Sequence, residues 1–136
     1  MTENGSAPLV LVADDDDDIL ELVTFRLERA GYEVITACDG EQALRAAREK
    51  APALAVLDVA MPKLTGIEVT EALREAEKTR EMPVILLTAS VQQADLERGM
   101  SAGANHYMRK PFDPAELREM VQALLERSAS GVSSGA

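Results

Sequence analysis

Four short stretches of this sequence that have the pattern of strands each lead into a polar side chain that could take part in chemistry. The residues that follow them are, in chain order, Asp14 with Asp15, Asp58, Thr88 and Lys110. If these side chains meet, three carboxylates crowd together and resist full ionisation until a cation neutralises them. An all-oxygen site with room for water suits Mg²⁺ better than Zn²⁺. Beside it, an ammonium and a hydroxyl would favour transfer of a phosphoryl group onto a carboxylate.

The position of Asp58 singles it out as the candidate acceptor. Leu54–Leu57 is an apolar run of the length typical of a strand buried on both faces. The residue after such a strand lies at the carboxyl edge of the sheet, where open α/β proteins keep their sites. Taken singly, an Asp at a strand end is more often a turn former, and the aspartate run Asp14–Asp18 would pass for a solvated loop. The joint occurrence of four such strand ends is the signal.

The elements that must position these residues alternate regularly. Strands are expected at 9–13, 32–36, 54–57, 83–87 and 105–108, and helices beginning near 19, 40, 65, 91 and 114. This alternation indicates an α/β fold around a parallel sheet. Right-handed crossovers leave two doubly wound strand orders. In the flavodoxin-like (βα)5 order 2-1-3-4-5, strands 1 and 3 flank the crevice, so Asp14, Asp15 and Asp58 would face one cleft. We predict this five-stranded doubly wound sheet.

The composition excludes several classes of function. A chain of 136 residues that is 46% apolar has material for one domain with a real core. Its net charge of −10 argues against direct binding of nucleic acid, whose phosphates attract Lys and Arg. No apolar run approaches the roughly 18 residues of a membrane span. Cys38 is the only cysteine, so we expect a reducing, cytoplasmic setting and a packing role for this thiol.

Three other functions compete with phosphoryl acceptance at Asp58. A flavodoxin-type electron carrier shares the fold, but five aspartates after the first strand would repel a flavin phosphate. An aspartyl-nucleophile phosphatase is suggested by the pair Asp14 and Asp16, and it would carry the phosphoryl group on Asp14. The third is an adaptor of the same shape that is never phosphorylated, against which the full set of polar strand ends argues.

The motifs resemble those of the receiver domain of two-component response regulators. They are Val10-Leu-Val-Ala-Asp14-Asp15-Asp16, Leu57-Asp58-Val-Ala-Met-Pro62, Leu87-Thr88-Ala89 and Lys110-Pro111-Phe112, and their spacing agrees as well. The resemblance covers residues 8–127, and we expect a single-domain receiver of the chemotaxis-regulator kind. Residues 1–7 would form a flexible N-terminus, and residues 128–136 a flexible tail or the stub of a linker.

The resemblance implies a chemistry for the candidate residues. Asp58 would accept a phosphoryl group from the phosphohistidine of a histidine kinase or phosphotransfer protein. Asp15, Asp58 and the carbonyl of Ala60 would hold Mg²⁺, with Asp14 acting directly or through water. Lys110 would pair with a phosphoryl oxygen. The chain would be a signalling receiver rather than an enzyme, limited to accepting and losing the phosphoryl group.

The resemblance also implies a switch. Thr88 would turn toward a phosphoryl oxygen, and Tyr107 would follow as the aromatic switch residue. A downstream protein or output domain would then bind the surface formed by the fourth helix, the fifth strand and the fifth helix. Asn105-His106 and Met120 depart from the Asp-Asp pair and the Arg of the DNA-binding subfamily that dimerises through its last helix. We therefore expect that dimer to be absent here.

Overall fold

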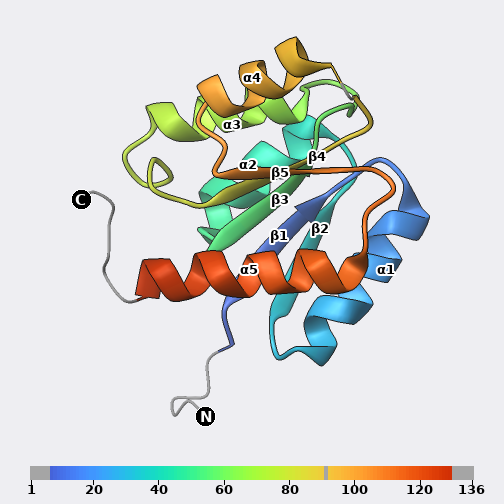
Figure 1. Cartoon of the computed structure of the whole chain (residues 1–136). Coiled ribbons are helices and arrows are strands. Elements are labelled where there is room, and N and C mark those ends of the chain that lie inside the picture. Colours follow the sequence, from blue (N-terminus) through green and yellow to red (C-terminus); the bar gives the residue numbers. More distant parts are fainter. Residues whose placement is uncertain (1–6, 91, 130–136) are drawn as a thin grey trace.

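The computed structural model describes residues 7–90 and 92–129, and it places five strands and five helices in strict alternation (Figure 1). The elements are β1 (Leu9–Ala13), α1 (Asp17–Arg29), β2 (Glu33–Ala37), α2 (Gly40–Lys50), β3 (Leu54–Asp58), α3 (Gly66–Glu75), β4 (Val84–Thr88), α4 (Gln93–Ser101), β5 (His106–Arg109) and α5 (Pro114–Ala129). The expected flexible ends lie outside the described residues, except for Ala7 at one end and Ser128 and Ala129, which belong to α5, at the other.

The strands form one parallel sheet in the order β2-β1-β3-β4-β5. The predicted flavodoxin-like order is therefore confirmed. Two of its three inner strands, β3 and β4, are buried along their whole length, as expected for continuous apolar runs covered on both faces. The order places β1 beside β3, so that the chain leaves both strands at the same edge of the sheet.

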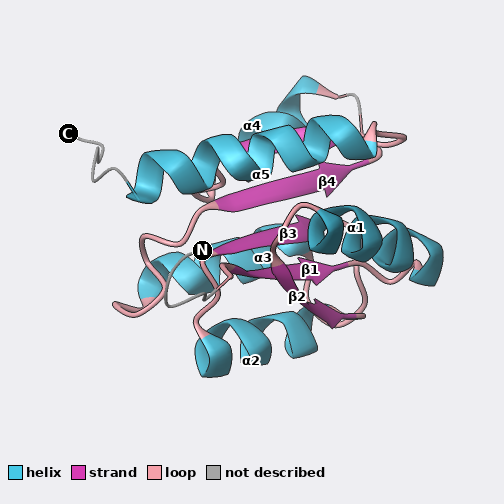
Figure 2. Ribbon diagram, turned by 90° about the horizontal axis from the view of Figure 1, so that it is seen from below, coloured by secondary structure: helices cyan, strands magenta, loops and turns pink. Residues whose placement is uncertain are grey.

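Two separate cores hold the helices against the sheet. Side chains that alternate along the strands pack either with Val23, Leu27, Leu117 and Val121 of α1 and α5, or with Ala43, Ala47, Val69 and Leu73 of α2 and α3. The helices α1 and α5 lie below the sheet in Figure 1, and Figure 2 shows the molecule from that side, so that they lie nearest the viewer. The sheet is thus held from both sides, and its carboxyl edge stays in a fixed position.

Polar residues fix where the helices begin. Asp16 caps α1 by accepting hydrogen bonds from the backbone N–H groups of Asp18 and Ile19, and Thr65 and Glu68 form a capping box at the start of α3. The helix α4 differs, because its N-cap residue Gln92 makes no side-chain hydrogen bond. It begins at Gln93, later than the position 91 that the sequence pattern indicates, and position 91 itself lies outside the described residues. The start of α4 is therefore less firmly held than the starts of α1 and α3.

Among residues 7–90 and 92–129, no helix is both long and apolar enough to cross a bilayer.

Candidate functional site

The candidate side chains all leave the sheet at its carboxyl edge. Asp14 directly follows β1, Asp58 and Thr88 end β3 and β4, and Lys110 directly follows β5. The register aligns these ends, since Ala13 pairs with Leu57 and Asp58 with Leu87. Parallel pairing of neighbouring strands is therefore what brings residues nearly a hundred positions apart to one place.

Asp14, Asp15 and Asp58 form the acidic centre of the site. Each offers a carboxylate oxygen, and the three oxygens lie within 4.8 Å of one another. Asp14 and Asp58 are buried, whereas Asp15 is exposed. The backbone N–H of Asp16 donates to Oδ1 of Asp14 at 2.9 Å, which fixes that side chain. The three predicted carboxylates are thus brought together.

Lys110 lies between the two buried carboxylates. Its Nζ is 3.0 Å from Oδ2 of Asp14 and 3.2 Å from Oδ1 of Asp58. Oδ2 of Asp14 is wholly buried, and the ion pair with Lys110 is its one contact among the described residues. Burial alone would lower the pKa of Lys110, but hydrogen bonding and attraction from Asp14 and Asp58 outweigh it and raise the pKa. Lys110 therefore stays protonated.

One positive charge does not balance two buried carboxylates. Burial, and then repulsion from Asp14, raise the pKa of Asp58 from 3.8 to about 6, although Lys110 and the Ala60 N–H act in the opposite direction. The Ala60 N–H donates to Oδ1 of Asp58 at 3.4 Å. Both partners of Asp58 contact Oδ1, and in the described part of the chain no hydrogen bond or ion pair engages Oδ2. Oδ2 is the free atom of this carboxylate.

A close approach of backbones shapes the loop after Asp58. A Cβ atom on Gly66, the first residue of α3, would overlap the carbonyl oxygen of Asp58. Glycine at this position lets the start of α3 pack directly on the end of β3. Ala60 lies between them on the exposed part of the loop, at the mouth of the site.

Thr88 is buried on the β4 side of the site, and its hydroxyl oxygen accepts a hydrogen bond from the backbone N–H of Ser90 at 3.0 Å. Ser90 in turn donates from Oγ to Oδ2 of Asp95 at 2.7 Å, and Arg98 donates to Oδ1 of Asp95 at 2.8 Å. The motifs did not reveal Asp95 or Arg98. The one local signal is their spacing of three residues on a helix, which is common in surface ion pairs.

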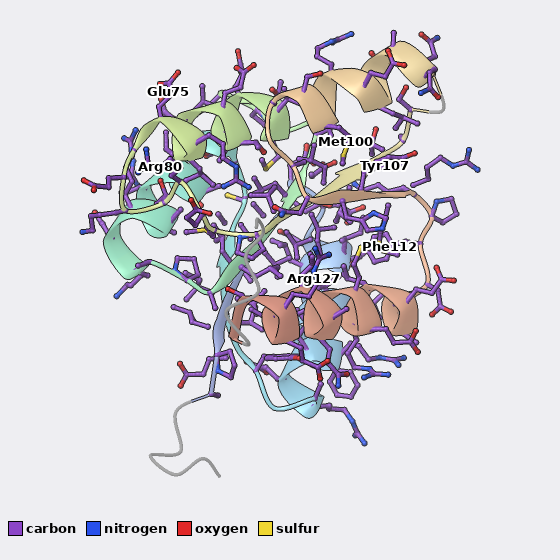
Figure 3. The ribbon with its side chains drawn as sticks, turned by 60° about the vertical axis from the view of Figure 1, so that its left-hand side comes forward. Glu75, Arg80, Met100, Tyr107, Phe112 and Arg127 are labelled. Atoms are coloured by element: carbon purple, nitrogen blue, oxygen red, sulfur yellow. The ribbon has the colours of Figure 1, made fainter. Side chains whose placement is uncertain are left out.

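A cavity of about 170 Å³ lies beneath α4. Its lining includes Thr88, Ser90, Leu96, Met100 and Tyr107. Figure 3 shows Tyr107 on β5 below α4, with Met100 close by. The candidate switch residue and the candidate hydroxyl thus border the same cavity.

The expected packing role of Cys38 is wrong. The thiol is exposed, and both its Sγ and the Cys38 backbone N–H donate to Oε1 of Gln42, at 3.4 and 3.1 Å. β2 is an edge strand of the sheet and ends at Ala37, so Cys38 lies just past it in the connection to α2.

Comparison with known proteins identifies the family. The response regulator receiver domain family matches residues 10–122. The alkaline phosphatase synthesis transcriptional regulatory protein PhoP of Bacillus subtilis is 47% identical over 119 residues, covering 88% of this chain and 49% of PhoP. The transcriptional regulatory protein PrrA of Mycobacterium tuberculosis is 44% identical over 134 residues, covering 98% of this chain and 57% of PrrA. The chain spans about half the length of these curated relatives.

Solved structures agree with the sequence relatives. The chemotaxis response regulator CheY4 of Vibrio cholerae has a TM-score of 0.82 and 34% identity, covering 88% of this chain and 99% of that one. The receiver domain of the sensor histidine kinase PA1611 of Pseudomonas aeruginosa, solved with a magnesium ion in its active site cleft, has a TM-score of 0.82 and 32% identity, covering 89% and 99%. With the strand order and the acidic edge described above, these likenesses show that the chain belongs to the response regulator receiver domains of two-component signalling.

Proposed function

We propose that this receiver domain takes its phosphoryl group on Oδ2 of Asp58. The observation that carries the proposal is the arrangement around that carboxylate: Lys110 and the Ala60 N–H both contact Oδ1, which leaves Oδ2 without a partner among residues 7–90 and 92–129. The raised pKa makes the carboxylate more basic than usual, yet it is ionised at neutral pH. A basic, ionised and unpartnered oxygen is a competent nucleophile.

The donor is a phosphohistidine of a histidine kinase or phosphotransfer protein. In the transfer, the N–P bond of the donor breaks, an O–P bond to Asp58 forms, and the released imidazole takes up a proton. Lys110 is held beside Asp58 by Asp14, which supports a role for its ammonium in neutralising the phosphoryl oxygens. Asp14 thus positions Lys110 as well as contributing its own charge.

The acidic centre fits a hard divalent cation. Three carboxylate oxygens lie within 4.8 Å of one another and form an all-oxygen donor set, and the single ammonium of Lys110 does not balance their charge. We propose Mg²⁺, held by Asp15, Asp58 and the Ala60 carbonyl, with Asp14 acting directly or through water. When bound, the ion would neutralise the carboxylates and the incoming phosphoryl oxygens.

The proposed switch starts from Thr88. Turning its hydroxyl toward a phosphoryl group on Asp58 would break the hydrogen bond from Ser90, which is itself tied to Asp95 on α4. The helix is easily moved, because it has no side-chain cap and its one buried residue is Gly99. The cavity beneath it leaves room for Tyr107 to move. The output would be a changed α4–β5–α5 surface.

We propose that a downstream protein or output domain binds this surface. PhoP and PrrA are transcriptional regulators, and this chain matches about half of each. We propose that the receiver domain itself makes no contact with nucleic acid, in keeping with its net charge of −10. Hydrogen exchange with and without beryllofluoride, which mimics the phosphoryl group, should differ most in α4 and β5. Equal protection along the chain would contradict the proposed switch.

Incubation with acetyl phosphate and Mg²⁺, followed by intact mass measurement, tests phosphoryl acceptance. The wild-type protein should gain one phosphoryl mass, and both Asp58→Asn and omission of Mg²⁺ should prevent it. The alternative, an aspartyl phosphatase, requires the label to persist in Asp58→Asn and to vanish in Asp14→Asn. Full labelling of Asp58→Asn would therefore refute the assignment.

A further inference from the structure

A second polar groove lies at the opposite edge of the sheet, between α1 and α5. It has a volume of about 560 Å³ and is lined by residues just before β1, at the end of α1, at the start of β2 and on α5: Pro8, Arg26, Arg29, Ala30, Gly31, Tyr32, Arg118 and Gln122. Pro8 leads into β1 at its amino end, whereas Asp14 leaves that strand at its carboxyl end. The groove is therefore separate from the phosphoacceptor site.

The charge of this groove is unusual for the protein. The chain carries 24 acidic and 14 basic residues, yet three arginines and no carboxylate line the groove. Within the described residues, no carboxylate pairs with Arg26 or Arg29, and the guanidinium of Arg29 lies over the ring of Phe25. Arg118 approaches Glu119 at 3.9 Å, the longest of the ion pairs in the described ranges. Arg118 also donates to Oε1 of Gln122 at 3.5 Å, which is a neutral partner. Close carboxylates therefore compensate little of the positive charge on the lining side chains, although Glu126 lies near enough to act on Tyr32.

Helix polarity explains only part of this arrangement. Arg26 and Arg29 occupy the last turn of α1, where positive charge favours the helix dipole. Arg118 lies in the first half of α5, where the helix dipole does not stabilise a positive charge. Convergence of arginines from two helices on one hollow is what a site for an anion requires, because guanidinium groups bind phosphate through paired N–H donors.

Two neutral polar residues, Tyr32 and Gln122, complete the lining. Burial, and then the nearby charge of Glu126, raise the pKa of Tyr32, although Arg118 acts in the opposite direction, so the phenol keeps its proton and can donate. The amide of Gln122 donates to Oε2 of Glu126 at 3.1 Å and accepts from Arg118 at 3.5 Å, so it links these two charged side chains of α5. The Tyr32 ring and Pro8 add apolar surface beside the charged groups.

We propose that this groove binds a small phosphate monoester through Arg26, Arg29, Arg118 and the Tyr32 hydroxyl. A bare phosphate ion would use the guanidinium groups alone, whereas the volume and the apolar lining match the dimensions of sites for small organic ligands. Binding would couple α1 to α5, two helices that pack in one core on the same face of the sheet. The groove thus offers a place where a metabolite could act on the receiver independently of its kinase.

The test uses the Asp58→Asn protein with a chelator, so that neither phosphorylation nor Mg²⁺ contributes. Adenosine monophosphate, titrated into isotope-labelled protein, should shift the backbone amide signals of 29–32 and 118–122 saturably. Inorganic phosphate should bind the same place more weakly. Arg26→Gln with Arg29→Gln should weaken binding by at least about tenfold, since each lost charge-assisted contact is worth about that much. Arg118→Gln should act in the same direction from the other helix.

Arg45→Gln with Arg48→Gln on α2 is the matched control, because it removes two arginines at the same spacing near a helix end. It should leave binding unchanged. Absence of saturable shifts up to about 10 mM nucleotide, where even millimolar binding would register, overturns the proposal. So does an equal loss in the α2 control, which would show general attraction to charge. Equal affinity for inorganic phosphate would overturn the choice of an organic ligand.

Discussion

Replacing Asp58 with Asn should stabilise the metal-free protein at neutral pH. The carboxyl of Asp58 is buried, and its pKa is raised from 3.8 to about 6 by burial and by Asp14. Because the folded pKa exceeds the unfolded one, the unfolded chain releases its proton first, and stability falls as pH rises from about 4 to about 6. At 1.36 kcal/mol per pH unit, this penalty reaches on the order of 3 kcal/mol above pH 7. Asn removes the charge, while Lys110 keeps its ion pair with Asp14.

Urea unfolding of both proteins at pH 4 and pH 7.5, with a chelator present, measures the effect. The gain in unfolding free energy from Asp58→Asn should be about 1 to 3 kcal/mol at pH 7.5 and should shrink to less than about 1 kcal/mol at pH 4. Asp15→Asn, which removes an exposed charge from the same cluster, should change stability by no more than about 0.5 kcal/mol. A destabilised Asp58→Asn protein at pH 7.5, or a gain independent of pH, would refute the view that Asp58 is held at an energetic cost.

Three further outcomes follow from the same geometry. Millimolar Mg²⁺ should raise the melting temperature, and the rise should be larger at pH 8 than at pH 5, because the metal ion and the proton compete for Asp58. A rise in melting temperature that does not depend on pH would contradict this. Asp95→Ala should speed hydrogen exchange across the start of α4 because it releases Ser90. Gln93→Ala, which removes a surface contact to Glu97, should leave the exchange unchanged. Equal exchange in both variants would show that the Ser90–Asp95 contact does not restrain the helix. Ala60→Arg should slow loss of the phosphoryl group at saturating Mg²⁺, because the larger side chain blocks the exposed mouth of the site. An unchanged rate with normal metal affinity would show that water enters elsewhere.

The sheet and its functional edge were predictable from the sequence for one physical reason. A buried parallel strand reads as an unbroken apolar run, so the polar residue that ends it marks the carboxyl edge without ambiguity, as at Asp58 and Thr88. Right-handed crossovers then restrict the strand order. The convergence of Asp14, Asp15 and Asp58 follows from that order alone.

Contacts that depend on side-chain direction were not predictable in this way. The ion pairs of Lys110 with both Asp14 and Asp58 depend on the path of the chain after β5. The contacts of Asp95 with Ser90 and Arg98 depend on the orientation of α4 relative to the sheet. The start of α4 was misplaced because no capping side chain marks it. The packing role expected for Cys38 was wrong because the residue type alone does not show that Cys38 lies just past the end of an edge strand, where its thiol is exposed.

The groove lined by three arginines gave no sequence signal for a related reason. Arg26 and Arg29 fit the ordinary pattern of basic residues at a helix end, and Arg118 lies about ninety positions further along the chain. Only the packing of α1 beside α5 brings them to one hollow. Long-range pairing of this kind is set by tertiary structure, not by a motif.

The most direct test of the central claim is to locate the phosphoryl group chemically. Protein treated with acetyl phosphate and Mg²⁺ is reduced with borohydride, which converts an aspartyl phosphate to homoserine, and the peptides are then sequenced by mass spectrometry. Homoserine at position 58, and at no other aspartate, is the predicted result. Homoserine at position 14, or none despite a gain in intact mass, would contradict the assignment of Asp58 as the acceptor.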